Sequence, residues 1–209
     1  MTALVSLVIP VRPAASAKSR LVADSSAEAH SRRAALAAAI ALDTVEAARE
    51  SHSIGELFVV GSLSERIEGV QVVDEPGLGL LVAIAEGLAR CSSTAPAAVL
   101  LGDLPALQPA DLDAALLGAS EHHWSFVADA EGVGTTLVVA QAGLPHSLRF
   151  GVGSAEQHSL AGYAELELPV TSGLRRDVDT LEQLDELAQL ARDAVVQLGP
   201  RTRALVPST

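Results

Sequence analysis

Short runs of apolar residues alternate along the chain with longer stretches whose apolar side chains recur at helical spacing. The short runs predict strands, because unbroken apolar groups of this length are typical of strands buried in a sheet. We expect strands at residues 4–9, 56–61, 70–73, 99–101, 124–128, 137–140 and 166–170, and helices at 27–50, 80–90, from 109, from 154 and at 181–192. Strands that alternate with helices favour an α/β protein, with a three-layer, mostly parallel sheet and helices on both faces.

Several helix ends carry local signals. Ser154 followed by Gln157, and Thr180 followed by Gln183, each fit a capping box, and Pro109 stands where a first helical residue is favoured. Residues from about 193 onward look like a loose tail. At 209 residues the chain is long enough for one sizeable core and short for two, so we expect a single domain over 1–209.

The stretch V-L-L-G-D-L-P at 99–105 places an acidic residue directly after a buried strand. Gly102 allows the backbone to turn, and Pro105 prevents the strand from continuing. Asp103 is therefore expected at the carboxyl end of a strand, where open α/β sheets bind ligands. A carboxylate there suits Mg²⁺, although a simple turn-capping role explains these seven residues equally well.

A basic loop follows the first predicted strand, which we expect to end at Pro10. The loop holds Arg12, Lys18 and Arg20 but no glycine, so it is not a P-loop. It could bind an anion or simply be a solvated surface. The net charge of −12 argues against a nucleic-acid partner, because phosphate backbones require clustered cations. These cations should instead gather locally against a small anionic ligand.

Two further loops contain closely spaced glycines. The loop D-E-P-G-L-G has Gly77 and Gly79, which would let the backbone approach a ligand. In F-G-V-G-S, Gly151 precedes a helix that we expect to start at Ser154, and free N–H groups at a helix start are suited to anions. A turn-forming role is the alternative for both loops.

Two late carboxylates could meet Asp103. In R-R-D-V-D-T, Asp177 and Asp179 point to the same face if the backbone is extended. Asp179 has helix capping as a rival role, which favours Asp177 as the partner of Asp103.

The cysteine count and the apolar runs indicate the cellular compartment. Cys91 is the only cysteine, so no intrachain disulfide can form, and a buried structural thiol is expected. The apolar start lacks a basic region, and no apolar run is long enough to span a membrane. We therefore expect a cytoplasmic protein without a membrane partner.

Several motifs together resemble the phosphoenolpyruvate/2-phospho-L-lactate guanylyltransferases of coenzyme F-420 biosynthesis, which are MobA-like nucleotidyltransferases. The motifs are I-P-V-R-P, A-K-S-R-L, G-D-L-P, G-T-T-L, F-G-V-G-S and G-L-R-R-D-V-D-T, in that order over about residues 4–192. The resemblance implies a GT-A/Rossmann-like nucleotidyltransferase fold. It also implies that the phosphate of a small phosphorylated acid attacks the α-phosphorus of GTP and releases pyrophosphate, with phosphoenolpyruvate favoured over 2-phospho-L-lactate.

The resemblance also implies the residues of the site. Metal binding, with Mg²⁺ as cofactor, falls to Asp103 and Asp177, with Asp179 as an alternative. Nucleotide binding falls to Arg12, Lys18, Arg20, Gly77 and Gly79, and Lys18 counts with Asp103 and Asp177 as catalytic. Binding of the acid falls to Thr135, Gly151 and Ser154. A downstream transferase of the same pathway is a further partner that the resemblance allows.

Two positions depart from the family pattern. Arg12 stands where lysine is usual, and Leu81 stands where asparagine is usual. They leave open a nucleotide-binding homologue without turnover. Another nucleotidyltransferase of the same fold is the other alternative, although the G-G-x-S-x-R-M-G type of loop is missing.

Overall fold

The computed structural model describes residues 3–11 and 27–206. The predicted nucleotide-binding residues Arg12, Lys18 and Arg20 lie outside the described residues. Within the described part, no helix is long and apolar enough to cross a membrane.

Within the described residues, seven strands form one sheet in the order β3-β2-β1-β4-β6-β5-β7. β6 runs antiparallel to both of its neighbours, and the other pairings are parallel. The prediction of a mostly parallel sheet is thus confirmed. The strands are β1 (Val5–Val11), β2 (Ile54–Gly61), β3 (Val70–Val73), β4 (Ala97–Leu100), β5 (Trp124–Ala128), β6 (Thr135–Ala140) and β7 (Ala164–Glu165).

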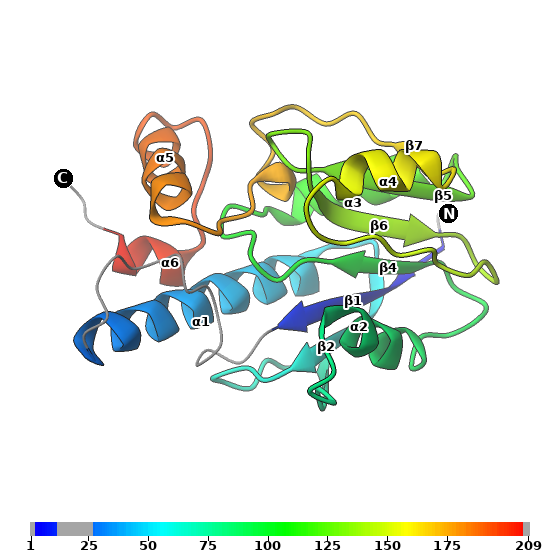
Figure 1. Ribbon diagram of the computed structural model, residues 1–209, viewed down its shortest axis with the longest axis horizontal. Helices are drawn as coiled ribbons and strands as arrows, with labels where there is room; N and C mark the ends of the chain where they lie inside the picture. Colours follow the sequence, from blue (N-terminus) through cyan, green and yellow to red (C-terminus); the bar gives the residue numbers. More distant parts are fainter. Residues whose placement is uncertain (1–2, 12–26, 207–209) are drawn as a thin grey trace.

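Helices cover both faces of the sheet, as predicted (Figure 1). Alternate side chains of β1 point to opposite faces, so Ile9 packs with α1 and α3 while Val8 packs with α2. Phe126 of β5 packs against the start of α4 on the α2 face. The helices are α1 (Ala27–Glu50), α2 (Leu80–Leu88), α3 (Pro109–Ala119), α4 (Ser154–Leu160), α5 (Leu181–Arg192) and α6 (Pro200–Leu205), with a 3-10 turn η1 (Gly173–Arg175).

Two predicted strand boundaries are wrong. β1 continues through Pro10, which pairs with Val60 of β2. The pairing of β1 with β4 ends at Val8. Pro10 therefore lies where β1 is hydrogen-bonded on one side only, and its missing N–H is tolerated there. The strand expected at 166–170 does not form, because the carbonyl oxygens of Leu168 and Val170 accept hydrogen bonds from the side chains of Arg175 and Arg176.

The expectation of a loose tail from about residue 193 is also wrong for the residues that the structure describes. Asp43 of α1 accepts hydrogen bonds from the backbone N–H groups of Arg201 (3.2 Å) and Thr202 (2.7 Å) at the start of α6. Leu198 and Thr202 are buried. Contacts with α1 thus hold this segment in place. Both α5 and α6 lie beyond the carboxyl ends of β1 and β4 (Figure 1).

Candidate active site

Three strand ends meet at one edge of the sheet. β4 and β5 both finish there, and β6 starts there because it runs antiparallel to them. The N–H of Leu101 donates to the carbonyl oxygen of Thr136 at 2.9 Å, which ties the end of β4 to the start of β6. The topology therefore brings Asp103, Asp129 and Thr135 to the edge where α/β sheets bind ligands.

The segment that carries Asp177 packs directly on the loop that carries Asp103. The N–H of Val178 donates to the carbonyl oxygen of Asp103 at 3.0 Å. The approach requires glycine at position 173, because a Cβ there would lie 1.8 Å from the carbonyl oxygen of Ala106. The two segments whose carboxylates were expected to meet are thus brought together, although 74 positions separate Asp103 from Asp177 in the sequence.

Asp177 is the centre of a group of acidic side chains. One carboxylate oxygen from each of Asp129, Glu131 and Asp177 lies within 4.8 Å of the other two. The pKa of Asp177 is raised to about 7, first by burial and then by four nearby carboxylates, those of Asp103, Asp129, Asp179 and Glu131. Several hard oxygen ligands that repel one another fit a divalent cation, which would relieve the repulsion. The three clustered carboxylates could therefore hold a metal ion.

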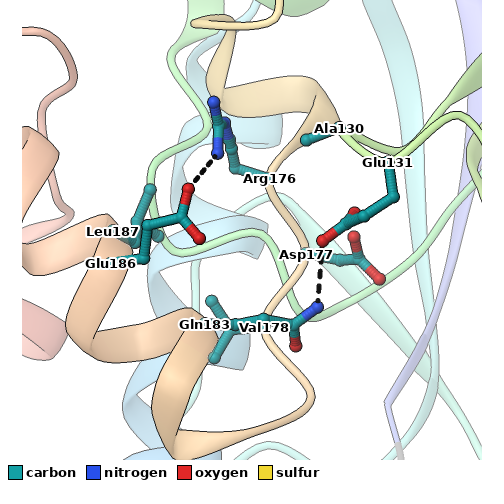
Figure 2. Close-up of a pocket in the computed structure, with 8 residues that line it drawn as sticks. All are labelled: Ala130, Glu131, Arg176, Asp177, Val178, Gln183, Glu186 and Leu187. Atoms are coloured by element: carbon teal, nitrogen blue, oxygen red, sulfur yellow. Dashed lines mark hydrogen bonds and ion pairs between the residues drawn. The ribbon is translucent and has the colours of Figure 1, made fainter.

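A shallow pocket opens beside this acidic group (Figure 2). It lies between the turn after β5 and the start of α5, and Glu131 and Asp177 point toward each other in it (Figure 2). The Gln183 side chain donates to Glu131 at 3.4 Å. On the far wall, Arg176 forms an ion pair with Glu186 at 3.2 Å, so its charge is already opposed. The pocket is lined by Ala130, Glu131, Arg176, Asp177, Val178, Gln183, Glu186 and Leu187.

Asp129 is held by the turn that follows it. One carboxylate oxygen accepts from the N–H of Val133 at 2.8 Å, and the other accepts from the N–H of Gly134 at 2.6 Å. A Cβ at position 134 would lie 2.4 Å from that second oxygen, so the close approach depends on glycine. Each carboxylate oxygen has a further lone pair, which leaves Asp129 able to bind a cation while it closes the turn.

Thr135, Gly151 and Ser154, the residues expected to bind the acid, also come together. Ser154 Oγ donates to Thr135 Oγ1 at 3.1 Å, and both residues are almost fully buried. The N–H of Ser154 donates to the carbonyl oxygen of Gly151 at 3.1 Å. His158 Nδ1 lies 3.0 Å from Thr135 Oγ1.

One part of the expectation for α4 is wrong. The helix begins at Ser154 as predicted, but Gly153 is its N-cap and no side chain caps it, since the hydroxyl of Ser154 bonds to Thr135 instead. The first N–H groups are not free either. Those of Ser154 and Ala155 donate to the carbonyl oxygens of Gly151 and Val133. Because Ser154 already donates its hydroxyl hydrogen, the hydroxyl of Thr135 is the one of this pair that can still donate to an anion.

Gly77 and Gly79 lie farther along the same edge. Both have positive φ angles, 73° and 97°, and they follow the end of β3. β2 and β1 lie between this loop and β4. Leu81, in the first turn of α2, is 50% exposed.

Four residues of the site were missed in the sequence. Asp129 and Glu131 directly follow a predicted strand, which is the signal that identified Asp103. Arg175 lies inside the motif G-L-R-R-D-V-D-T, but its contacts, like those of His158, are with residues far along the chain, which no local pattern reveals. Asp179 is exposed, and its N–H bonds to Gln183, while Thr180 caps α5 with the predicted capping box.

Comparisons with known proteins bear on this site. The chain matches the family model described as guanylyl transferase CofC like over residues 5–190. A phosphoenolpyruvate guanylyltransferase from Thermomonospora curvata is 42% identical over 209 residues, covering 96% of this chain and 87% of that protein.

Solved structures show the same fold at low sequence identity. One from Desulfovibrio desulfuricans G20, assigned by name to the nucleotide-diphospho-sugar transferases, has a TM-score of 0.71 at 15% identity, covering 96% of this chain and 93% of that chain. A protein from Mycobacterium tuberculosis H37Rv, solved in complex with manganese, has a TM-score of 0.56 at 18% identity, covering 90% of this chain and 100% of that chain. The predicted nucleotidyltransferase fold is thus confirmed.

Proposed function

The chain belongs to the guanylyl transferase CofC-like family, and from that premise we propose that it joins GMP from GTP to the phosphate of phosphoenolpyruvate and releases pyrophosphate. The name of the Thermomonospora curvata relative supports phosphoenolpyruvate over 2-phospho-L-lactate. The proposed reaction belongs to coenzyme F-420 biosynthesis, in the cytoplasm, with a downstream transferase of that pathway as consumer of the product.

The observation that carries the proposal is the meeting of an acidic group with a pair of buried hydroxyls at one sheet edge. The acidic group centres on Asp177, and the hydroxyls are those of Thr135 and Ser154. A reaction between two phosphate-bearing substrates needs both their charge and their position controlled. A cation held by the acidic group would neutralise phosphate charge, and the neutral hydroxyls beside it would position the acid.

We assign the acidic group to Mg²⁺. Asp103 and Asp177 are the proposed ligands, with Asp129 and Glu131 close enough to Asp177 to share the ion and Asp179 as an alternative. The manganese complex of the Mycobacterium tuberculosis neighbour supports a divalent cation. Such an ion, when bound, neutralises phosphate charge and orients phosphate oxygens. The carboxylates of this chain hold that charge at the carboxyl edge of β4.

The nucleotide roles remain with the residues identified from the sequence. Lys18, as a catalytic cation, would act with Arg12 and Arg20 on the triphosphate and the leaving pyrophosphate. Gly77 and Gly79 would let the backbone of their loop approach the nucleotide, a use compatible with their positive φ angles.

The acid would be held by a hydroxyl donor rather than by a cation. Thr135 supplies the O–H, and Ser154 supports it by donating its own hydroxyl hydrogen to Thr135 Oγ1. Gly151 leaves room beside them, since a Cβ there would meet nothing within 4 Å. Neutral donors bind a carboxylate without adding a second positive cluster near the metal ligands.

Pyrophosphate release, measured with Mg²⁺ and every pairing of one nucleoside triphosphate with one acid, tests the proposal. We expect release with GTP and phosphoenolpyruvate, and little with 2-phospho-L-lactate or 3-phosphoglycerate. Release with another nucleotide or a sugar phosphate would indicate a different transferase of this fold. GTP binding without release would indicate a nucleotide-binding homologue, and either outcome overturns the assignment.

A further inference from the structure

His158 is a fully buried histidine in an aromatic cage. Its ring centroid lies 5.6 Å from that of Phe126, 5.9 Å from that of Phe150 and 5.2 Å from that of Tyr163. Both ring nitrogens nevertheless have polar partners: Nε2 faces the N–H of Arg149 at 3.0 Å, and Nδ1 faces the hydroxyl of Thr135 at 3.0 Å. A buried imidazole with two such partners has a definite tautomer, which the partners determine.

The N–H of Arg149 decides which nitrogen carries the proton. A backbone amide nitrogen can only donate, so Nε2 must accept with its lone pair. The neutral ring then carries its proton on Nδ1, and that N–H points at Thr135 Oγ1. A doubly protonated ring would bring two N–H groups against each other at Nε2, and burial already lowers the pKa of His158 to about 4. Nδ1 is therefore the donor of the ring, and Thr135 Oγ1 shares its N–H with the backbone of Ser154.

Thr135 Oγ1 consequently accepts two hydrogen bonds. One comes from His158 Nδ1–H and the other from Ser154 Oγ–H at 3.1 Å. A hydroxyl oxygen has two lone pairs, and both are used by these donors. The remaining capacity of Thr135 is its own O–H, which must point away from both partners. The hydroxyl is thus restricted to donation, the polarity that an anionic oxygen requires.

We propose that His158 is a positioning residue that orients the Thr135 hydroxyl as a donor to the carboxylate of the acid substrate. His158 does not touch substrate in this scheme; it acts through Thr135. The inference rests on the proposed function, because it takes Thr135 and Ser154 as the binding site for the acid. It adds a residue that the sequence motifs did not single out, and it explains why a polar ring lies among Phe126, Phe150 and Tyr163.

Two amide substitutions separate the two nitrogens of the ring. His158→Asn places an amide near the Nδ1 position, so it can still donate to Thr135 but cannot reach Arg149. His158→Gln places its amide near the Nε2 position, so it can still accept from Arg149 but loses the donor to Thr135. The pair differs by one methylene, and both keep a neutral polar side chain in the cage.

Steady-state kinetics of both variants, with GTP and phosphoenolpyruvate varied in turn, form the test. We expect His158→Gln to raise the KM for phosphoenolpyruvate roughly tenfold, the effect of one lost hydrogen bond to a charged group, and to leave the KM for GTP unchanged. His158→Asn should stay within about threefold of the native KM for the acid, which is the rescue expected of a conservative variant. In a Thr135→Val background, His158→Gln should have no further effect on that KM.

Other outcomes overturn the inference. Equal effects of both variants on the two substrates, or an undiminished effect of His158→Gln in the Thr135→Val background, would mean that His158 only packs. If the variants do not fold, ¹⁵N spectra of the native imidazole decide: a proton on Nε2 at neutral pH contradicts the scheme, and a proton on Nδ1 supports it. Absence of turnover by the native protein with any acid would instead reject the proposed function, and the imidazole spectra remain informative in that case.

Discussion

Arg175 holds the backbone carbonyl oxygen of Asp129 with two of its nitrogens, Nε at 3.2 Å and Nη2 at 2.7 Å. The same guanidinium donates to the carbonyl oxygens of Ala128 and Leu168, both at 3.0 Å. Asp177 follows two residues later in the chain. The side chain of Arg175 therefore fixes the end of β5 against the segment that carries Asp177, and so relates the carboxylates of Asp129 and Asp177.

Arg175→Lys should impair turnover more than it impairs folding. Lysine keeps the charge but loses the planar fork that reaches several carbonyl oxygens at once. We expect the free energy of unfolding to fall by about 1–3 kcal/mol, and turnover to fall by a factor of ten or more as the carboxylates separate. Urea unfolding and pyrophosphate release measure the two quantities.

The neighbouring arginine provides the control. Arg176 donates to one carbonyl oxygen, that of Val170, whereas Arg175 reaches three. Its other partner is Glu186, which is largely exposed, and such pairs contribute little to stability. Arg176→Lys should therefore leave turnover close to the native value. Similar losses in Arg175→Lys and Arg176→Lys would show that turnover does not depend specifically on the contacts of Arg175 with the end of β5.

The metal assignment predicts unequal effects at two aspartates on one short segment. Asp177→Asn should lower turnover on the order of 10²-fold or more with the fold intact, because oriented charge is the main catalytic resource in this reaction. Asp103→Asn should behave in the same way. Asp179→Asn, at an exposed position, should have a small effect. Turnover of Asp177→Asn within a few-fold of native would transfer the metal role to Asp179.

The contact between the loop of Asp103 and the segment of Asp177 depends on one glycine. Gly173→Ala would place a Cβ 1.8 Å from the carbonyl oxygen of Ala106, so the backbones must move apart. We expect a loss of about 1–3 kcal/mol in the free energy of unfolding, together with a clear loss of turnover. Gly118→Ala, in α3, is the control, since a Cβ there would lie 3.7 Å from its nearest neighbour, the side chain of Leu166, which is an ordinary contact. Native turnover in Gly173→Ala would contradict the dependence of the site on this contact.

Much of the fold could be predicted because its signals are local. The long alanine-rich helix begins and ends at the predicted residues, and the capping box of Thr180 and Gln183 forms as its spacing indicates. The apolar runs predicted six of the strands to within a few residues. A strand buried on both faces, or a helix with a local cap, requires no knowledge of distant residues to be predicted.

The failures involve side-chain contacts that hydrophobic periodicity does not reveal. The strand expected at 166–170 is prevented by arginines six and seven residues farther on, and α6 is held by Asp43, which lies 159 positions before Thr202. The same division applies to the site. Asp103 and Asp177 have local motifs, whereas the contacts of His158 and Arg175 exist only once β5, β6 and α4 have assembled.

The buried neutral state of His158 predicts a pH effect on stability. Its pKa is lowered to about 4 by burial, opposed by a backbone hydrogen bond with Ser154 and assisted by the charges of Arg149 and His146. The unfolded chain takes up this proton near its ordinary pKa of 6.5, so the unfolded state is favoured as the pH falls from 6.5 toward 4. Stability from this group is therefore complete above pH 6.5 and declines below it.

The difference between native protein and His158→Asn isolates that contribution from other titrating groups, including His146, whose pKa is also lowered to about 4 by burial. Urea unfolding at several pH values should show a steeper loss of stability on acidification in the native protein than in the variant. Parallel pH dependences would mean that His158 titrates normally in the folded state.

Gly151 is the last residue of the proposed acid site, and its effect should be specific to one substrate. Its φ angle is 115°, and a Cβ there would meet no atom within 4 Å, so a larger side chain would occupy open space beside Ser154. Gly151→Val should raise the KM for phosphoenolpyruvate roughly tenfold or more and leave that for GTP nearly unchanged.

Gly162→Val is a matched control: its φ is 88°, its Cβ would also meet nothing within 4 Å, and it lies past the other end of α4. Because both variants strain the backbone in the same region of φ, a rise confined to Gly151→Val and to the acid would indicate blocked access and exclude a general distortion of α4. Equal changes in the KM of both substrates, or equal effects of the two variants, would remove Gly151 from the acid site.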